Sequence, residues 1–401
     1  MKPLPPLATL WCAVTVASVA ALAGDVAPTS AGSSPYAKWT RGPEPDAGYF
    51  PIAVWLQSPA RATRYREAGF NTFVGLWNGP TDAQLDTLKQ AGMKVICELN
   101  DVARKRLDDP TLIGWMHGDE PDNAQARQGG GYGPPIPPAD IIRDYERLRQ
   151  IDPSRPILLN LGQGVAWDGW HGRGVRTNHP EDYPEYIRGG DIVSFDIYPV
   201  THDRAPVAGQ LGYVGRGVER LVRWGEGRKI IWNCIECTRI QHPTAKPTPA
   251  QVRSEVWMSL IHGSRGLIYF VHEWQPRFNE AALLDDREML AAVTKLNRQI
   301  TTLAPVLNGP DVTGAVQIQS DNSAVPVVTL VKASGADLFV FAVAMGDTAA
   351  GANFRLTHPT RAYRTIEVLE ESRELAIEAG TFRDTFEPWG VHLYRLRAVN
   401  P

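Results

Sequence analysis

Eight short apolar runs recur between residues 50 and 303, and polar loops and amphipathic helices separate them. Each run is almost continuously apolar, as a strand covered on both faces must be. Alternating strands and helices form a parallel sheet, and eight such units close into a (β/α)8 TIM barrel of about 250 residues. The predicted strands span 50–55, 71–76, 93–99, 112–117, 156–161, 191–198, 229–235 and 267–272.

Helical periodicity fills the segments between these runs. Helix starts are indicated by Thr81-Asp82 and by Thr248-Pro249, which places a proline in the first turn. The periodicity is weaker in 102–107 and 181–188 than elsewhere. It is clear in 59–68, 81–91, 139–150, 214–224, 248–262 and 283–302.

The loops that follow strands are much longer than the loops that follow helices. The links from helix to strand are one or two residues, such as Gly69 and 91–92, whereas 118–138 and 162–180 follow strands. All loops after strands gather at the C-terminal face of a barrel, where barrel active sites lie. The alternative is a doubly wound open sheet. Such a sheet typically has a glycine-rich phosphate-binding turn after its first strand, and 50–59 contains none.

The sequence changes character after Pro305. Short β-rich segments separated by turns predict an antiparallel β-sandwich over 304–401. Because no cluster of exposed aromatic residues is evident there, we expect an accessory domain that packs on the barrel. The predicted strands are 312–319, 325–332, 338–344, 353–356, 365–369 and 392–396.

The first 23 residues have the pattern of a secretory signal peptide. Lys2 precedes an uncharged apolar stretch that ends in Ala21-Leu22-Ala23. The alternative is an uncleaved anchor, although the stretch is shorter than the ~20 residues that span a bilayer, and no later segment resembles a membrane span. Residues 24–48, rich in Ala, Pro, Ser and Gly, predict a flexible linker before a catalytic barrel over 49–303. We therefore expect a secreted or periplasmic protein.

Charge and cysteine content exclude several classes of function. The net charge of −3, without basic blocks, argues against a nucleic-acid partner. Cys234 and Cys237 have C-x-x-C spacing, but no second Cys or His pair completes a zinc site. No His-x-His sequence ends a strand either. We therefore expect neither a metal nor another cofactor.

Two glutamates end strands on opposite sides of the predicted barrel. Glu120 follows the fourth strand and Glu236 ends the seventh, so both side chains are expected at the C-terminal face. A pair of carboxyl groups is the minimum machinery for hydrolysis of a glycosidic bond. One must stay protonated to donate to the leaving oxygen, while the other stays ionised.

The sequence Asp119-Glu120-Pro121, after a strand that contains Gly-Trp, resembles the Asn-Glu-Pro signature of the clan A glycoside hydrolases. That group includes cellulases, mannanases and β-galactosidases. The resemblance covers about residues 50–303 and implies Glu120 as acid/base, Glu236 as nucleophile and retention of configuration. Asp119 stands where most of the clan has Asn, and an ionised Asp can only accept hydrogen bonds from a sugar hydroxyl.

Further side chains at strand ends are candidate substrate ligands. Asp196 and Tyr198 alternate along strand six and share a face. The clan resemblance implies that Tyr198 lies near the nucleophile and that Trp274 forms a floor for the sugar. Glu273, just after strand eight, is the reserve nucleophile. The other candidates are Glu98, Asn160, Trp55, Trp77, Trp167 and Trp170, the tryptophans because sugar faces stack on aromatic planes.

These residues predict an exported glycosidase that acts on an oligo- or polysaccharide. A non-catalytic carbohydrate-binding barrel is the main alternative, because a fold does not by itself confer an activity. An exported barrel hydrolase of another bond type would need a Ser or Cys nucleophile with a His partner, and no such pair is evident.

Overall fold

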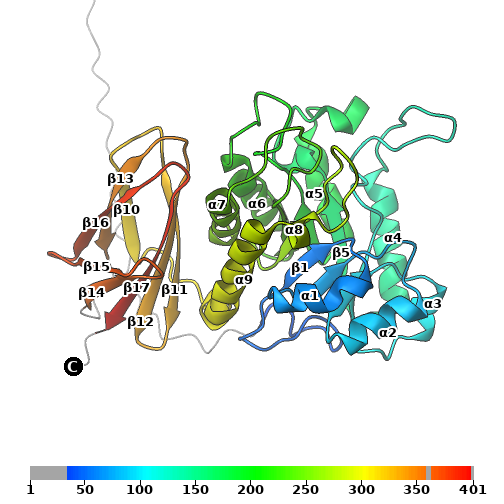
Figure 1. Cartoon of the computed structure of the whole chain (residues 1–401), viewed down its shortest axis with the longest axis horizontal. Helices are drawn as coiled ribbons and strands as arrows, with labels where there is room; N and C mark the ends of the chain where they lie inside the picture. Colours follow the sequence, from blue (N-terminus) through cyan, green and yellow to red (C-terminus); the bar gives the residue numbers. More distant parts are fainter. Residues whose placement is uncertain (1–33, 358–362, 399–401) are drawn as a thin grey trace, which may run out of the picture. The chain divides into compact units, whose positions relative to one another are not determined.

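The structure is a computed structural model that describes residues 34–357 and 363–398 (Figure 1). The predicted signal peptide, 1–23, lies outside the described residues, as do the first ten residues of the predicted linker.

A closed parallel barrel forms the first part of the described chain. Its sheet order is β7-β6-β5-β4-β3-β2-β1-β9-β8. β7 and β8 are two parts of one strand interrupted at Trp232, so the order closes on itself and the predicted eight-stranded TIM barrel is confirmed. The strands are β1 (Ile52–Trp55), β2 (Thr72–Val74), β3 (Lys94–Cys97), β4 (Leu112–Met116), β5 (Ile157–Leu161), β6 (Ile192–Phe195), β7 (Ile230–Ile231), β8 (Asn233–Glu236) and β9 (Leu267–Phe270).

Helices surround these strands, as Figure 1 shows. The two predicted helix starts are confirmed, because the Thr81 and Thr248 side chains each form a capping box with a glutamine three residues later. The helices are α1 (Ala62–Glu67), α2 (Asp82–Gln90), α3 (Asp101–Lys105), α4 (Pro138–Ile151), α5 (Tyr183–Tyr186), α6 (Gly212–Gly225), α7 (Pro249–Ile261), α8 (Ala282–Asp285) and α9 (Arg287–Leu307).

Side-chain alternation along the strands gives the barrel two apolar layers. On β6, Ile192 faces the barrel interior and Val193 faces the helices. Asp196 and Tyr198 continue the inward-facing set beyond the end of β6, so both reach the C-terminal face of the barrel, as predicted.

The N-terminal end of the barrel is sealed by the segment before β1, and this corrects the prediction of a flexible linker. Tyr36 is 1% exposed and Trp39 is 6% exposed, and both belong to the apolar cluster inside the barrel. The Tyr36 hydroxyl donates to the carbonyl of Arg265 (2.7 Å) and accepts from the Trp232 indole N–H (2.9 Å). The burial of these two aromatic side chains therefore fixes the segment on the barrel, although the residues around them have the composition of a linker.

The C-terminal part is built of two antiparallel sheets with orders β10-β13-β16 and β11-β12-β17-β14-β15, which confirms a sandwich-like domain. The sequence did not predict β15 or β16, and α9 runs past the predicted boundary at 304. The strands are β10 (Val316–Ser320), β11 (Val327–Ser334), β12 (Asp337–Ala344), β13 (Ala350–Leu356), β14 (Tyr363–Val368), β15 (Arg373–Ala376), β16 (Thr381–Phe386) and β17 (Val391–Ala398).

Helix α7 contacts the larger of these two sheets. The Trp257 and Phe341 ring centroids are 5.1 Å apart, and the Arg253 guanidinium donates to the carbonyl of Val391 at 2.9 Å. These contacts agree with the expectation of a domain that packs on the barrel. Within the described part of the chain, no helix is both long enough and apolar enough to cross a membrane.

Candidate active site

Glu120 lies just beyond β4, at the C-terminal face of the barrel. Its backbone has a φ of +43°, a left-handed conformation that is unfavourable for a residue with a side chain. Such strain costs about 1–3 kcal/mol and is concentrated at functional sites. The Glu120 side chain is half-buried, so it remains accessible from solvent.

Two groups face the Glu120 carboxyl. The Asn123 amide donates to Glu120 Oε2 at 2.8 Å, and the Trp170 indole N–H donates to Asn123 Oδ1 at 2.9 Å, which fixes the orientation of that amide. On another side, the carboxyl of Asp196 lies within hydrogen-bonding reach of Glu120. One oxygen of Asp196, Oδ1, is buried and accepts no hydrogen bond from a donor among the described residues.

The acidic surroundings change the proton affinity of these groups. Burial, followed by the charges of Asp196 and Asp119, raises the pKa of Glu120 well above its ordinary value. Burial also raises the pKa of Asp196 to about 7, although its hydrogen bond with Glu120 opposes the rise. The surroundings thus favour the protonated form of Glu120.

Asp119 is exposed to solvent beside this pair. Its Oδ1 accepts a hydrogen bond from the Asn160 amide at 2.9 Å, and Asn160 Oδ1 in turn accepts from the Ser194 hydroxyl at 2.7 Å. Although the residue as a whole is exposed, protein atoms surround its carboxyl group, and this burial raises the pKa of Asp119 to about 6, while the Asn160 hydrogen bond opposes the rise. The structure thus brings together four predicted site residues: Asp119, Glu120, Asn160 and Asp196.

Asp122 anchors the loop that carries Glu120, and the sequence did not single it out. Its side chain is fully buried and accepts hydrogen bonds from the Gly162 amide and the Tyr183 hydroxyl, each at 2.9 Å. Asn123, the donor to Glu120, was missed as well. Their position directly after Pro121, as two polar residues following a strand, is the signal that could have indicated both.

Glu236 is not part of this group. It is 0% exposed, and its carboxylate accepts from the Val200 amide (2.6 Å), the Thr201 amide (3.0 Å) and the Thr201 hydroxyl (2.7 Å). The acidic side chain beside it is the buried Glu255 of α7, whereas the acidic groups whose charges raise the pKa of Glu120 are Asp196, Asp119 and Asp122. The expected meeting of Glu120 and Glu236 is therefore corrected: the structure buries Glu236 beneath the loop that follows β6.

The buried state of Glu236 has an electrostatic consequence. Burial raises its pKa to about 7, and the hydrogen bonds from Thr201 and Val200 only partly oppose this. Its neighbour Glu255 also has a raised pKa, because it is fully buried beside Glu236. The role that this geometry supports for Glu236 is to hold the loop after β6 in place.

Aromatic side chains form two groups at the C-terminal face. In the first, Trp167, Trp170 and His202 lie together, with ring centroids 5.5 Å apart for Trp167–His202 and 6.2 Å apart for the two tryptophans. Trp170 links this group to Glu120 through Asn123. Trp170 is thus one residue removed from Glu120, and Trp167 packs on Trp170.

The second aromatic group surrounds His272, just beyond β9. Trp274 stacks on His272, with centroids 6.1 Å apart, and Trp77 meets the same ring edge-on at 6.1 Å. His272 in turn contacts Phe270, which contacts Tyr198 at 5.3 Å. Trp77, Trp274 and Tyr198 are thus connected through these rings.

Three predicted site residues have other surroundings. Trp55 is 6% exposed and belongs to the apolar cluster inside the barrel. Glu273, the reserve nucleophile, forms an ion pair with Arg239 at 2.6 Å. Glu98 is exposed directly after β3. Trp55 and Glu273 are therefore engaged in packing and in an ion pair, and only Glu98 is open to solvent.

The cysteines and the possible metal ligands of the described residues do not meet the needs of thiol and metal sites. Cys97, Cys234 and Cys237 are all buried and free. Within the described residues, no three His, Cys, Asp or Glu side chains are grouped so that they could hold a metal ion. The arrangement at the C-terminal face can instead hold a proton between two acids and release it.

A parallel (β/α)8 barrel with an acid pair at the carboxyl ends of its strands, followed by a β-sandwich, defines the class of this fold. An α-amylase from Geobacillus thermoleovorans, solved with acarbose, has a TM-score of 0.55 to this chain at 11% identity, covering 88% of this chain and 99% of the amylase. An Anoxybacillus α-amylase has a TM-score of 0.53 at 10% identity, covering 89% and 100%. A maltogenic α-amylase from Thermotoga neapolitana has a TM-score of 0.51 at 8% identity, covering 88% and 99%.

These likenesses confirm the fold that the resemblance to the clan A hydrolases implied. No model of a known protein family matches the sequence, and a comparison with curated proteins gives no match either.

Proposed function

We propose that this protein is a glycoside hydrolase in which Glu120 is the general acid. The observation that carries the proposal is the Glu120 carboxyl at the C-terminal face of the barrel, whose pKa is raised by burial and by the neighbouring Asp196 and Asp119 carboxyls. A proton donor of this kind is what the leaving oxygen of a glycoside requires. The likeness of the fold to α-amylases is consistent with this chemistry.

Asp196 takes the second carboxylate role in place of Glu236. It is half-buried rather than sealed, it faces Glu120, and it ionises more readily than Glu120. The two carboxyls of a glycosidase act across the scissile bond at about 5–5.5 Å in retaining enzymes, so a bound sugar would have to separate this pair.

The proposed reaction keeps retention of configuration and proceeds in two steps. In the first, an Asp196 oxygen bonds to the anomeric carbon while Glu120 gives its proton to the glycosidic oxygen, and the bond to the leaving group breaks. In the second, the Glu120 carboxylate takes a proton from water, the water oxygen bonds to the anomeric carbon, and the bond to Asp196 breaks. Asp119 and Asn160 are placed beside the pair to bind sugar hydroxyls.

Hydrolysis of a panel of aryl glycosides and polysaccharides by two variants tests this proposal. E120Q should lose about 10²–10⁴-fold in kcat on substrates with poor leaving groups, and much less on activated aryl glycosides that need no proton. D196N should lose activity on both. E146Q and D203N alter exposed carboxyls on α4 and on the loop after β6, and should keep full activity. Full activity of E120Q and D196N on the best substrate would exclude the assignment.

The burial of Glu236 specifically favours one alternative, a barrel that binds carbohydrate without cleaving it. In that case the unaltered protein would bind an oligosaccharide in calorimetry, and the product analysis would show no cleavage after long incubation. Binding would then be the whole function of the Glu120–Asp196 region.

We further propose that residues 1–23 direct export of the chain. The charged start, the apolar stretch and the Ala21-Leu22-Ala23 ending support this. Expression of the full chain in a bacterial host, followed by fractionation and N-terminal sequencing, should give a periplasmic or secreted product that begins at Gly24. Recovery of the uncleaved chain inside the cell would contradict export.

A further inference from the structure

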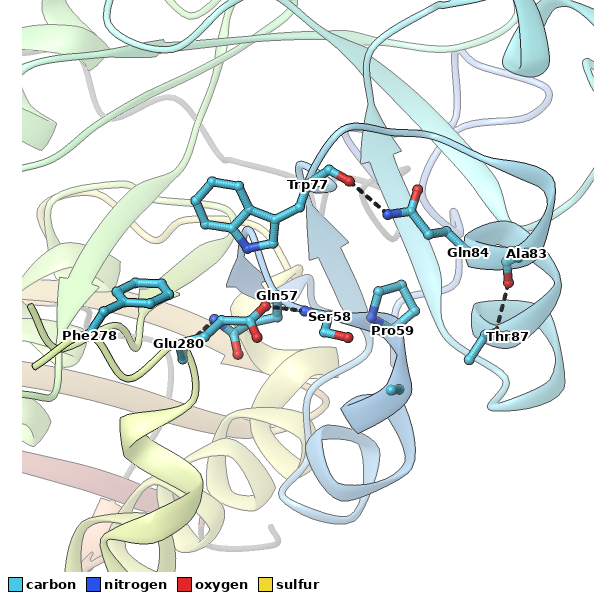
Figure 2. A pocket seen from close by; sticks show the side chains of 10 residues that line it. Gln57, Ser58, Pro59, Trp77, Ala83, Gln84, Thr87, Phe278 and Glu280 are labelled. Atoms are coloured by element: carbon cyan, nitrogen blue, oxygen red, sulfur yellow. Dashed lines mark hydrogen bonds between the residues drawn. The ribbon is translucent and has the colours of Figure 1, made fainter.

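A cavity of about 560 Å³ opens beside the second aromatic group, on the loops that follow β1, β2 and β9 (Figure 2). Trp77 and Phe278 line it from two different loops, together with Ser58, Gln84 and Glu280. Its volume lies within the range of small-molecule sites in proteins. None of the groups in the Glu120–Asp196 pair lines it, so it is a separate site.

Exposed aromatic side chains are concentrated around this cavity. Among the described residues, six large apolar side chains are exposed, and three of them, Trp77 (40%), Trp274 (44%) and Phe278 (51%), gather here. Trp274 and Phe278 have ring centroids 4.7 Å apart. Exposed apolar side chains that gather in one place indicate a binding surface, whereas scattered ones need no explanation.

The walls of the cavity are held rigidly. The Gln84 amide donates to the carbonyl of Trp77 at 2.9 Å, and the backbone N–H of Ser58 donates to the Glu280 carboxylate at 2.6 Å. Arg61 also bonds to the Glu280 carboxylate. Because the loops that carry Trp77 and Phe278 are tied to the barrel in this way, little ordering is needed when a ligand binds.

The cavity also offers unused polar groups. Within the described residues, neither the indole N–H of Trp77 nor the hydroxyl of Ser58 makes a hydrogen bond, and the carboxylate of Glu280 can accept further bonds. A flat apolar face beside a few donors and acceptors matches a pyranose ring, which has C–H faces and equatorial hydroxyls.

A row of packed rings joins the wall of this cavity to the candidate active site. Trp77 contacts His272 at 6.1 Å, His272 contacts Phe270 at 4.9 Å, and Phe270 contacts Tyr198 at 5.3 Å. Tyr198 shares its strand face with Asp196. Trp77 and Tyr198 therefore lie at the two ends of one aromatic row at the C-terminal face, and Tyr198 is the end next to Asp196.

We infer that this cavity is a second sugar-binding subsite, which holds a remote unit of the same carbohydrate chain whose scissile bond lies at Glu120. This inference rests on the proposed function and deepens it: the substrate is an extended oligo- or polysaccharide rather than a simple glycoside. Stacking on Trp77 and Phe278 supplies apolar contact, and Ser58 and Glu280 bind hydroxyls.

The test compares substrates of different length. Wild type, W77A, W77F and F278A are assayed on an aryl monoglycoside and on cello-, xylo-, manno- and malto-oligosaccharides of two to six units. For the best hexasaccharide, W77A should lose about tenfold more kcat/KM than for the monoglycoside, and W77F should restore most of the difference. V222A, which removes an exposed apolar side chain on α6, should change neither value. An equal loss for long and short substrates in W77A would overturn the subsite.

A binding measurement separates this result from the proposed function. The same oligosaccharides are titrated by calorimetry into E120Q and into the double variant E120Q/W77A. If no substrate is cleaved by wild type but hexasaccharide binding weakens about tenfold only when Trp77 is removed, the subsite stands and the hydrolase proposal fails. If hexasaccharide affinity is the same in both proteins, the subsite inference fails whatever the enzyme cleaves.

Discussion

The carboxyl groups of Glu120 and Asp196 lie within hydrogen-bonding reach of each other, although 76 positions separate them in the sequence. Two acids this close share protons, and the protonation of one changes the affinity of the other. The pair therefore titrates as a unit, with apparent pKa values that belong to both residues. Two predictions follow from its environment and two from other parts of the structure.

The pH dependence of activity should reflect the raised pKa values of this pair. Asp196, with a pKa of about 7, must be ionised for attack, so kcat/KM should fall as the pH drops below about 7. Glu120 must be protonated, so activity should fall again only above neutral pH, because its pKa lies well above the ordinary value. A profile on the best substrate that peaks between pH 4 and 5 would contradict these assignments.

Removal of the Asn123 amide should shift the alkaline limb of the pH–activity profile to higher pH. The amide donates to Glu120 and stabilises its ionised form, so N123A should raise the pKa of Glu120 further. We expect a kcat about fivefold lower, because Glu120 also loses a positioning contact worth about 1 kcal/mol. W170F, which removes only the indole donor to Asn123, should shift the limb in the same direction by less. An unchanged or lower alkaline limb in N123A would show that the amide does not act on Glu120.

Glu236 should make the protein less stable as the pH rises. Its pKa is about 7 in the folded state against an ordinary value of 4.5, so the folded state holds a proton that the unfolded state releases between these values. The free energy of unfolding therefore falls from about pH 4.5 to pH 7, by up to about 3 kcal/mol from this group. E236Q should have a lower free energy of unfolding than wild type, because the side-chain amide places an NH2 group against the backbone N–H donors of Val200 and Thr201. Between pH 4.5 and pH 7, however, its free energy of unfolding should fall by less than that of wild type.

Chemical denaturation at several pH values measures both effects. E146Q, with its exposed side chain on α4, is the matched control and should follow the wild-type slope. If E236Q shows the full wild-type pH dependence, Glu236 does not carry the proton in the folded state.

The tyrosine that seals the N-terminal end of the barrel should contribute to stability and not to catalysis. Y36F removes one hydroxyl and leaves the Arg265 carbonyl and the Trp232 indole N–H without their partner. Each unsatisfied buried group costs about 1–3 kcal/mol, so we expect a loss of about 2 kcal/mol or more in the free energy of unfolding. Y132F, at an exposed position, should cost nothing. If Y36F has the same free energy of unfolding as wild type, the hydrogen bonds of Tyr36 with Arg265 and Trp232 do not stabilise the protein.

The barrel could be predicted from sequence because its strands are covered on both faces. Eight apolar runs therefore stand out between polar loops, and the caps at Thr81 and Thr248 mark helix starts by local chemistry alone. The strands β15 and β16 were missed for the opposite reason. β16 alternates exposed and buried residues, and β15 is four residues long, so neither forms an apolar run.

The candidate site could be located from sequence but not fully assigned. Glu120 and Asp196 were found because a residue after a parallel strand must lie at the C-terminal face. Glu236 also ends a strand, and its register places it beside the inward-facing Phe270. Its burial depends on the backbone amides of Val200 and Thr201, and amide donors have no sequence signature.

The role of the first described residues was hidden by local composition. Tyr36 and Trp39 stand among Ala, Pro, Ser and Gly, which by themselves predict a linker. The hydrogen-bond partners of Tyr36 are Arg265 and Trp232, far along the chain, so no local pattern could show the contact.

The bond between Tyr36 and Arg265 joins residues that are 229 positions apart, and this sets an order for assembly during synthesis. Tyr36 leaves the ribosome early, but the surface that receives it is not complete until well over half of the polypeptide has been made. The contact that closes the N-terminal end of the barrel can therefore form only after Arg265 has been synthesised. A shortened chain that starts after Trp39 would lack Tyr36, and the indole N–H of Trp232 would lose its hydrogen-bond acceptor at the N-terminal end of the barrel.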